Sequence, residues 1–239
     1  MFFGGTGLFF FDSGLIYFVI PAGIFAMYAQ GKVKSAYAKY SKVMANKRIT
    51  GAQVARTLLD RMGLQDVDVE LTSGHLSDHY DPKAKKVRLS REVHNGTSLA
   101  SLAIAAHETG HANQHDEGYF FLAFRNNFVP LAQFGSSLAM PLFLIGFIFS
   151  AQGGGPTYLM DLGIAFFSFA LIFQLVTLPV EFNASSRAMA LLTNEGIITN
   201  EEQKGTKAVL NAAALTYIAA TAVALAQLLR LILLRNSRR

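Results

Sequence analysis

Long runs of apolar residues divide the chain more clearly than any other feature. Three of them cover about residues 8–28, 130–150 and 159–179, and each is long enough to cross a bilayer as a helix. The Gly-rich segment 152–156 between the second and third runs predicts a tight turn. These two runs are therefore expected to form a transmembrane hairpin, which returns the chain after residue 179 to the side on which the hairpin began.

A fourth apolar run, at about residues 208–229, is less uniform because it contains polar residues such as Asn211 and Gln227. It either spans the membrane or forms a helix that is buried against the polar part of the protein or lies at the membrane surface. We favour a span. A span, however, places the basic tail that begins at Arg230 opposite to the side that the positive-inside rule prefers.

Basic residues predict the orientation of the first run. No Lys or Arg precedes it, which argues against a cleaved signal peptide. Six basic residues follow it closely: Lys32, Lys34, Lys39, Lys42, Lys47 and Arg48. The N-terminus is therefore expected outside the bacterial plasma membrane, and the segment that follows is expected in the cytoplasm.

The polar region at about residues 29–129 shows patterns of both helices and strands. A helix is predicted over 50–63, where Thr50 can cap the first turn, and another over 98–114. Residues 67–71 and 86–89 alternate apolar and polar positions, as strands do. Because the segment 74–82 between them is rich in turn residues, we expect the two strands to form a long β-hairpin.

Composition narrows the class of protein. Of the 239 residues, 51% are hydrophobic, and the mean hydropathy is +0.31, which fits a membrane protein. The net charge of +5 comes from basic residues next to apolar runs, so lipid headgroups are the expected partners and nucleic acid is not. The chain has no cysteine, which excludes disulfides, thiolate zinc sites and cysteine nucleophiles.

The sequence His107-Glu108-Thr109-Gly110-His111 is an H-E-x-x-H motif within the second predicted helix. Two histidines four positions apart share one helix face, so both imidazoles can bind one Zn²⁺. Glu108 is then placed to act as the general base for the attacking water. The alternative is a buried helix with two incidental histidines.

A catalytic zinc site needs a third protein ligand. A metzincin would have a histidine at position 117, which is Glu117 here. His115 lies along the same helix, about 12 Å from His107 by helix rise, so it is expected to lie beside the ligands, to face the substrate or to be in solvent. Glu181, which we expect near the start of a further helix, is the best candidate. Asp161 would be the ligand in an intramembrane protease, but the apolar run before His107 is too short to span.

The chain resembles the bacterial neutral zinc metallopeptidases of the YugP-like membrane group. The resemblance rests on residues 74–82, 87–90, 105–112 and 178–185, and with the apolar runs it covers most of the chain. It implies a membrane-bound peptidase in which His107, His111 and Glu181 bind zinc and Glu108 is the base. Related membrane peptidases often have aspartate four residues after the glutamate ligand, whereas this chain has Ser185.

Other residues have roles that the sequence leaves open. Zinc peptidases of this broad type bind substrate along a sheet edge, and the strand 87–90 is either that edge or a core strand. His75, His79 and Tyr80 could stabilise an oxyanion, but we favour a role for Asp78, His79 and Asp81 in organising the turn. Arg187 could orient a ligand, bind substrate or remain a surface charge.

Together these patterns predict a mainly α protein with membrane helices and a small α+β, zincin-like catalytic domain that contains a β-hairpin and the H-E-x-x-H helix. The predicted parts are an anchor (1–29), a catalytic region (30–129), a transmembrane hairpin (130–180), a helix with the third ligand (181–207) and a C-terminal hydrophobic helix with a basic tail (208–239).

The predicted function is a zinc metalloendopeptidase with one Zn²⁺ per chain that cleaves peptides or membrane proteins. Two alternatives are a non-enzymatic scaffold with a structural zinc, completed by His115, and an intramembrane site-2-type protease. A homo-oligomer or a regulatory membrane partner stays open.

Overall fold

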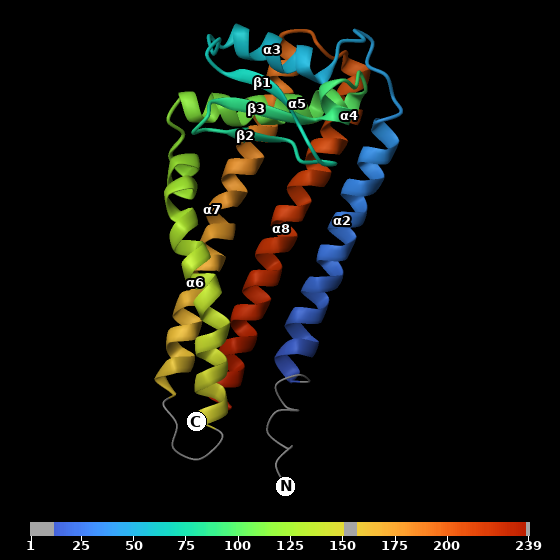
Figure 1. The fold of residues 1–239 in the computed structure, drawn as a ribbon. Helices are drawn as coiled ribbons and strands as arrows, with labels where there is room; N and C mark the ends of the chain where they lie inside the picture. Colours follow the sequence, from blue (N-terminus) through green and yellow to red (C-terminus); the bar gives the residue numbers. More distant parts are fainter. Residues whose placement is uncertain (1–11, 151–156, 238–239) are drawn as a thin grey trace. The chain divides into compact units, whose positions relative to one another are not determined.

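The computed structural model describes residues 12–150 and 157–237, which form two compact units (Figure 1). The sheet unit comprises Gln30–Ala123 and Pro179–Thr216. The helical unit contains the remaining described residues, 12–29, 124–150, 157–178 and 217–237. The predicted turn at 152–156, the start of the first apolar run and the last two arginines lie outside the described residues.

Four long helices account for the apolar runs. They are the helix Leu15–Tyr40 (η1, Leu15–Val19, and α2, Ile20–Tyr40), α6 (Phe120–Ser150), α7 (Tyr158–Asn194) and α8 (Asn200–Asn236). Within the described residues, these four are long and apolar enough to cross a membrane. The fourth predicted run thus belongs to a helix with the length and composition of a span.

The helical unit is held together by apolar packing and by two ion pairs. Phe143, Phe147 and Met160 form a buried cluster with Leu231 and Leu234 of α8. Small residues allow close packing, since a Cβ at Gly163 would lie 2.7 Å from the carbonyl oxygen of Ala139. The ion pairs join Asp12 to Arg230 and Asp161 to Arg235, with shortest distances of 2.8 and 2.6 Å.

The sheet unit combines α3 (Gly51–Arg61), α4 (Arg91–His94) and α5 (Leu99–Asp116) with three strands. Both predicted helices are confirmed, and local caps explain where they begin. Thr50 and Gln53 form a reciprocal capping box at α3, and the hydroxyl of Ser98 accepts from the N–H of Ser101 at α5. Apolar faces of α3 and α5 pack together in a core that includes Leu58, Leu102 and Ala106.

The predicted long hairpin is wrong, although both of its strands exist. The strands β1 (Asp68–Thr72), β2 (His79–Asp81) and β3 (Lys86–Ser90) form a sheet of order β1-β3-β2. The strand β1 pairs in parallel with β3, and the antiparallel partner of β3 is the short strand β2. The segment expected to be only a turn therefore contains a strand. Because β3 is central, with Val87 and Leu89 fully buried, residues 87–90 are a core strand and not an edge.

Glu181 does not lie near the start of a separate helix, contrary to our expectation. The helix α7 continues through Pro179 and ends at Asn194, so Glu181 follows the apolar part of the same helix. Only a short connection separates Asn194 from the start of α8 at Asn200. The five-part domain division itself stays a prediction.

Candidate metal centre

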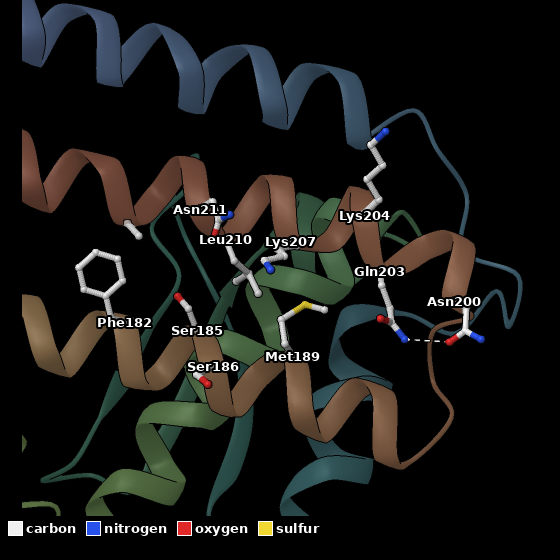
Figure 2. A pocket seen from close by; sticks show the side chains of 11 residues that line it. Phe182, Ser185, Ser186, Met189, Asn200, Gln203, Lys204, Lys207, Leu210 and Asn211 are labelled. Carbon is white, nitrogen blue, oxygen red and sulfur yellow. Dashed lines mark hydrogen bonds between the residues drawn. The ribbon is translucent and has the colours of Figure 1, made fainter.

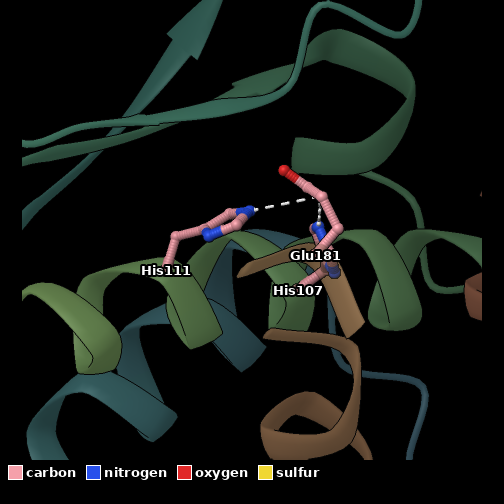
Figure 3. Close-up of side chains that lie close together, drawn as sticks. All are labelled: His107, His111 and Glu181. Carbon is pink, nitrogen blue, oxygen red and sulfur yellow. Dashed lines mark hydrogen bonds and ion pairs between the residues drawn. The ribbon is translucent and has the colours of Figure 1, made fainter. Parts of the chain in front are cut away.

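The three residues that could bind a metal come from two helices of the sheet unit. His107 and His111 lie one turn apart on α5, and Glu181 faces them from α7 (Figure 3). Residue 110, between the two histidines, is glycine, and a Cβ there would lie 2.7 Å from the carbonyl oxygen of Ala184. Gly110 therefore permits the close approach of the α7 backbone that brings Glu181 to the histidines.

The distances between the donor atoms fit one small cation. Oε2 of Glu181 lies 3.2 Å from Nε2 of His107 and 3.6 Å from Nε2 of His111. All three donors lie within 4.8 Å of one another. In a tetrahedral zinc site with bonds of about 2.0–2.1 Å, neighbouring donors are about 3.3 Å apart. Two imidazoles and one carboxylate are also a common zinc donor set, so these residues can hold the ion.

Each histidine has a partner on its other ring nitrogen. Nδ1 of His107 lies 3.2 Å from Oγ of Ser185, and Nδ1 of His111 lies 3.0 Å from Oε1 of Gln114. Both oxygens can accept from an Nδ1–H, which leaves each Nε2 lone pair free for a metal. The partner of His107 is thus the hydroxyl of Ser185, at the position where the resemblance would often place an aspartate.

Gln114 links the two helices of the centre, and our sequence analysis missed it. The side chain is fully buried. Its amide nitrogen donates to the carbonyl oxygen of Val180 and to Oδ1 of Asn183, both at 2.8 Å. The sequence feature that could have indicated this contact is the position of Gln114 three residues after His111, on the same side of the helix.

Glu108 is buried beside the donors but is not one of them. Burial raises the pKa of this carboxyl to about 7, while the neighbouring His107 and a hydrogen bond from the backbone N–H of Tyr80 oppose the rise. A carboxyl with a pKa close to neutrality can both accept and return a proton at physiological pH. The contact with Tyr80 also places β2 next to Glu108.

The other predicted residues lie around the centre in different roles. Nδ1 of His115 lies 2.9 Å from the hydroxyl of Tyr80, so within the described residues His115 is outside the donor cluster. His79 is exposed, and its Nδ1 lies 2.8 Å from the carbonyl oxygen of Ser77. Asp78 accepts from the backbone N–H of Ser90, and Asp81 accepts from two backbone N–H groups of the following turn. These contacts support the role in turn organisation.

Arg187 acts through other side chains. Its Nε donates to Oδ1 of Asn183 at 2.7 Å, and its guanidinium pairs with Glu117 at 2.6 Å. Since Asn183 also accepts from Gln114, a chain of hydrogen bonds runs from Arg187 through these amides to His111. Arg187 is therefore connected to His111 through these amides, and its pair with Glu117 joins α7 to the end of α5.

His107, His111 and Glu181, two of them from an H-E-x-x-H motif, form a cluster that could hold a metal ion in a chain with four candidate membrane spans among its described residues. The chain belongs to the family described as "Putative neutral zinc metallopeptidase", whose family model matches residues 15–236. It is 48% identical over 219 residues to the "Putative membrane protease YugP" of Bacillus subtilis (strain 168). The matched residues cover 92% of this chain and 95% of that protein. No solved structure gives a significant match.

Proposed function

We propose that this protein is a membrane-bound zinc endopeptidase whose catalytic centre consists of His107, Glu108, His111 and Glu181. The observation that carries the proposal is the convergence of the buried His111 and Glu181 with the half-buried His107 at zinc-like spacing, with Glu108 next to His107 in the chain. The helix α5, which contains the H-E-x-x-H motif, is not among the described helices that are long and apolar enough to be candidate spans. This argues against the intramembrane alternative.

The chain's own residues divide the chemistry as follows. A zinc ion bound by His107, His111 and Glu181 would polarise the scissile carbonyl and make the attacking water more acidic. Glu108 takes the proton from that water and then delivers it to the leaving amine. Gln114 and Ser185 hold the two imidazoles in the tautomer that binds the metal.

The sheet offers a place for the peptide. In the order β1-β3-β2, the strand β2 pairs on one side only within the described residues, and the backbone N–H of Tyr80 in this strand donates to Glu108. An extended peptide added to the free edge of β2 would pass the catalytic glutamate, with its backbone held by strand-type hydrogen bonds. Because residues 87–90 form the central strand, residues 79–81 are the substrate edge in this proposal.

The scaffold alternative needs a fourth protein ligand. Among the described residues, only His107, His111 and Glu181 form a potential metal cluster. His115, which would have to complete it, is instead engaged by Tyr80. A centre with three protein ligands retains an open position for chemistry, as catalytic zinc sites do.

The test measures metal content and cleavage separately in detergent-purified protein. Wild type should hold about one zinc per chain. Glu181→Ala should lose the metal while it stays folded, and His115→Ala should retain it. Loss of zinc in His115→Ala with an intact fold would support the scaffold.

Cleavage is measured on a proteome-derived peptide library, with the products identified by mass spectrometry. Glu108→Gln should keep zinc and lose about 10²- to 10⁴-fold in rate, because a general base contributes on that order. Asp116→Asn, a carboxylate-to-amide change at an exposed position of the same helix, is the matched control. Wild-type activity in Glu108→Gln would refute the mechanism, and a zinc-loaded wild type that cleaves no peptide would refute the peptidase.

A further inference from the structure

A groove that is distinct from the donor cluster lies between α7 and α8 in the sheet unit. Its volume is about 630 Å³, which is within the usual range for ligand sites. Phe182, Ser185 and Met189 line it from α7, and Gln203, Lys207 and Leu210 line it from α8. Figure 2 shows these two sets of side chains on facing helices.

The charge of the groove is positive. Lys204 and Lys207 contribute to its lining, which includes no acidic residue. Both lysines are exposed, and within the described part of the chain neither forms an ion pair. The neighbouring Glu202 forms no ion pair with either lysine, and its buried carboxylate accepts from the backbone N–H groups of Asn46 and Thr199. The groove also includes Asn200, at the positive end of the α8 dipole.

The lining changes from polar to apolar along the two helices. Asn200, Gln203 and the two lysines lie in the first turns of α8, whereas Leu210 and Ala214 follow further along it. On α7, Phe182 is 45% exposed and comes directly after the apolar part of a candidate span. The groove therefore lies where the polar start of α8 and the polar end of α7 meet their membrane-type segments.

We propose that this groove binds an anionic phospholipid. The phosphate lies near Lys207, with Lys204 three residues earlier on α8, and an acyl chain lies against Phe182 and Leu210. A basic pocket between membrane helices provides both features of such a lipid, a cation for the headgroup and an apolar wall for the chain. A soluble phosphate would use only the lysines, and an acidic peptide would leave the apolar wall uncovered.

The occupant would also contact a residue that supports the metal centre. Ser185 lines the groove, and its hydroxyl lies 3.2 Å from Nδ1 of His107. Lipid binding itself does not depend on the proposed peptidase, so it can be tested without zinc and without a cleavage assay.

The test uses the absence of tryptophan from the chain. Phe182→Trp places a single indole in the groove, and the full-length variant is reconstituted in phosphatidylcholine vesicles. Brominated phosphatidylglycerol and brominated phosphatidylcholine are compared as quenchers at equal mole fraction. Each lysine near an anionic lipid contributes about a fivefold factor, so phosphatidylglycerol should be preferred by up to about 30-fold.

Matched charge variants in the Phe182→Trp background assign the preference. Lys204→Gln/Lys207→Gln should lower the preference for phosphatidylglycerol over phosphatidylcholine to about one. Lys42→Gln/Lys47→Gln should leave this preference unchanged, because Lys42 and Lys47 are exposed and outside the groove. Circular dichroism checks that each variant is folded. Equal quenching by the two lipids in the parent, or an equal loss in both double variants, would overturn the proposal. So would displacement of the lipid by millimolar inorganic phosphate or by a short oligoglutamate.

Discussion

Replacing Gln114 should separate metal affinity from the stability of the fold. Its Oε1 accepts from His111, while its amide nitrogen donates to the carbonyl oxygen of Val180 and to Asn183. Gln114→Leu removes both functions at nearly constant size. Gln114→Glu keeps the acceptor for His111 but loses the donors. Both variants therefore lack the hydrogen bonds to Val180 and Asn183, and only Gln114→Leu also lacks the acceptor for His111.

The expected magnitudes follow from these contacts. In Gln114→Leu the Nδ1–H of His111 loses its partner, and the imidazole is free to turn or to change tautomer. Loss of such a partner lowers metal affinity by about 10- to 100-fold, which is about 1.4–2.7 kcal/mol. This agrees with the cost of about 1–3 kcal/mol for one unsatisfied buried polar group.

Gln114→Glu should behave in the opposite way. Its carboxylate accepts from His111, as in carboxylate–histidine–zinc arrangements, so zinc affinity should be retained or increased. The same carboxylate faces two acceptor oxygens, of Val180 and Asn183, in a fully buried position. The loss of these two hydrogen bonds, together with the repulsion between the carboxylate and the two oxygens, should lower the free energy of unfolding by about 2–4 kcal/mol.

Zinc affinity is measured by competition with a chromophoric chelator, and stability is measured by thermal unfolding of the metal-free protein. Asn113→Ala is the control on the same helix, because Asn113 contacts Glu117 and Arg187 but neither histidine. The reasoning fails if Gln114→Leu binds zinc within about twofold of wild type. It also fails if folded Gln114→Glu loses as much affinity as Gln114→Leu.

Three further predictions use other features of the structure. Gly110→Ala should destabilise the protein by about 1–3 kcal/mol and lower its zinc occupancy, because the new Cβ forces Ala184 away from α5. Gly31→Ala is the control, because a Cβ at that position meets no atom, and it should change neither property. Thermal melts and metal analysis measure the two effects. Ser185→Ala should lower zinc affinity by up to about tenfold and Ser185→Asp should raise it, as read by chelator competition; the reverse order would exclude Ser185 as the partner of His107. In intact cells, an impermeant maleimide should label Tyr158→Cys and Ser237→Cys but not Lys47→Cys. The parent protein, which has no cysteine, provides the blank. Labelling of Lys47→Cys alone would reverse the predicted orientation.

Local signals explain what the sequence could predict. The starts of α3 and α5 depend on neighbouring caps, Thr50 with Gln53 and Ser98 with Ser101, which can be read without knowledge of the fold. The two histidines converge because a helix places positions four apart on one face. These parts of the site require no information from distant segments.

Strand pairing was predicted incorrectly because alternation identifies a strand but not its partner. The strand β2 has only three residues, and none of them is buried, so it carries no apolar pattern. Its turn is organised by Asp81, which accepts from the backbone N–H groups of Lys83 and Ala84. The close hairpin with β2 takes one side of β3 and leaves the other side for parallel pairing with β1.

The supporting contacts of the metal centre depend on where α7 lies. The end of the apolar run at Pro179 indicated a new helix, whereas the helix continues and places Glu181, Asn183 and Ser185 against α5. A glutamine after an H-E-x-x-H motif has no distinctive pattern of its own. Its role becomes visible only when Val180 and Asn183 are brought to it by the second helix.

The ion pairs of the helical unit bear on the basic end of α8, which conflicted with the positive-inside rule. Arg230 is paired with Asp12, with each side chain 10% exposed, and Arg235 is held by both carboxylate oxygens of Asp161 at 2.6 and 2.8 Å. Charged residues in membrane helices are tolerated when they pair with one another. These two arginines therefore do not require anionic headgroups on the cytoplasmic side. The six basic residues that follow the first span remain the stronger signal for orientation, and a spanning α8 is compatible with them.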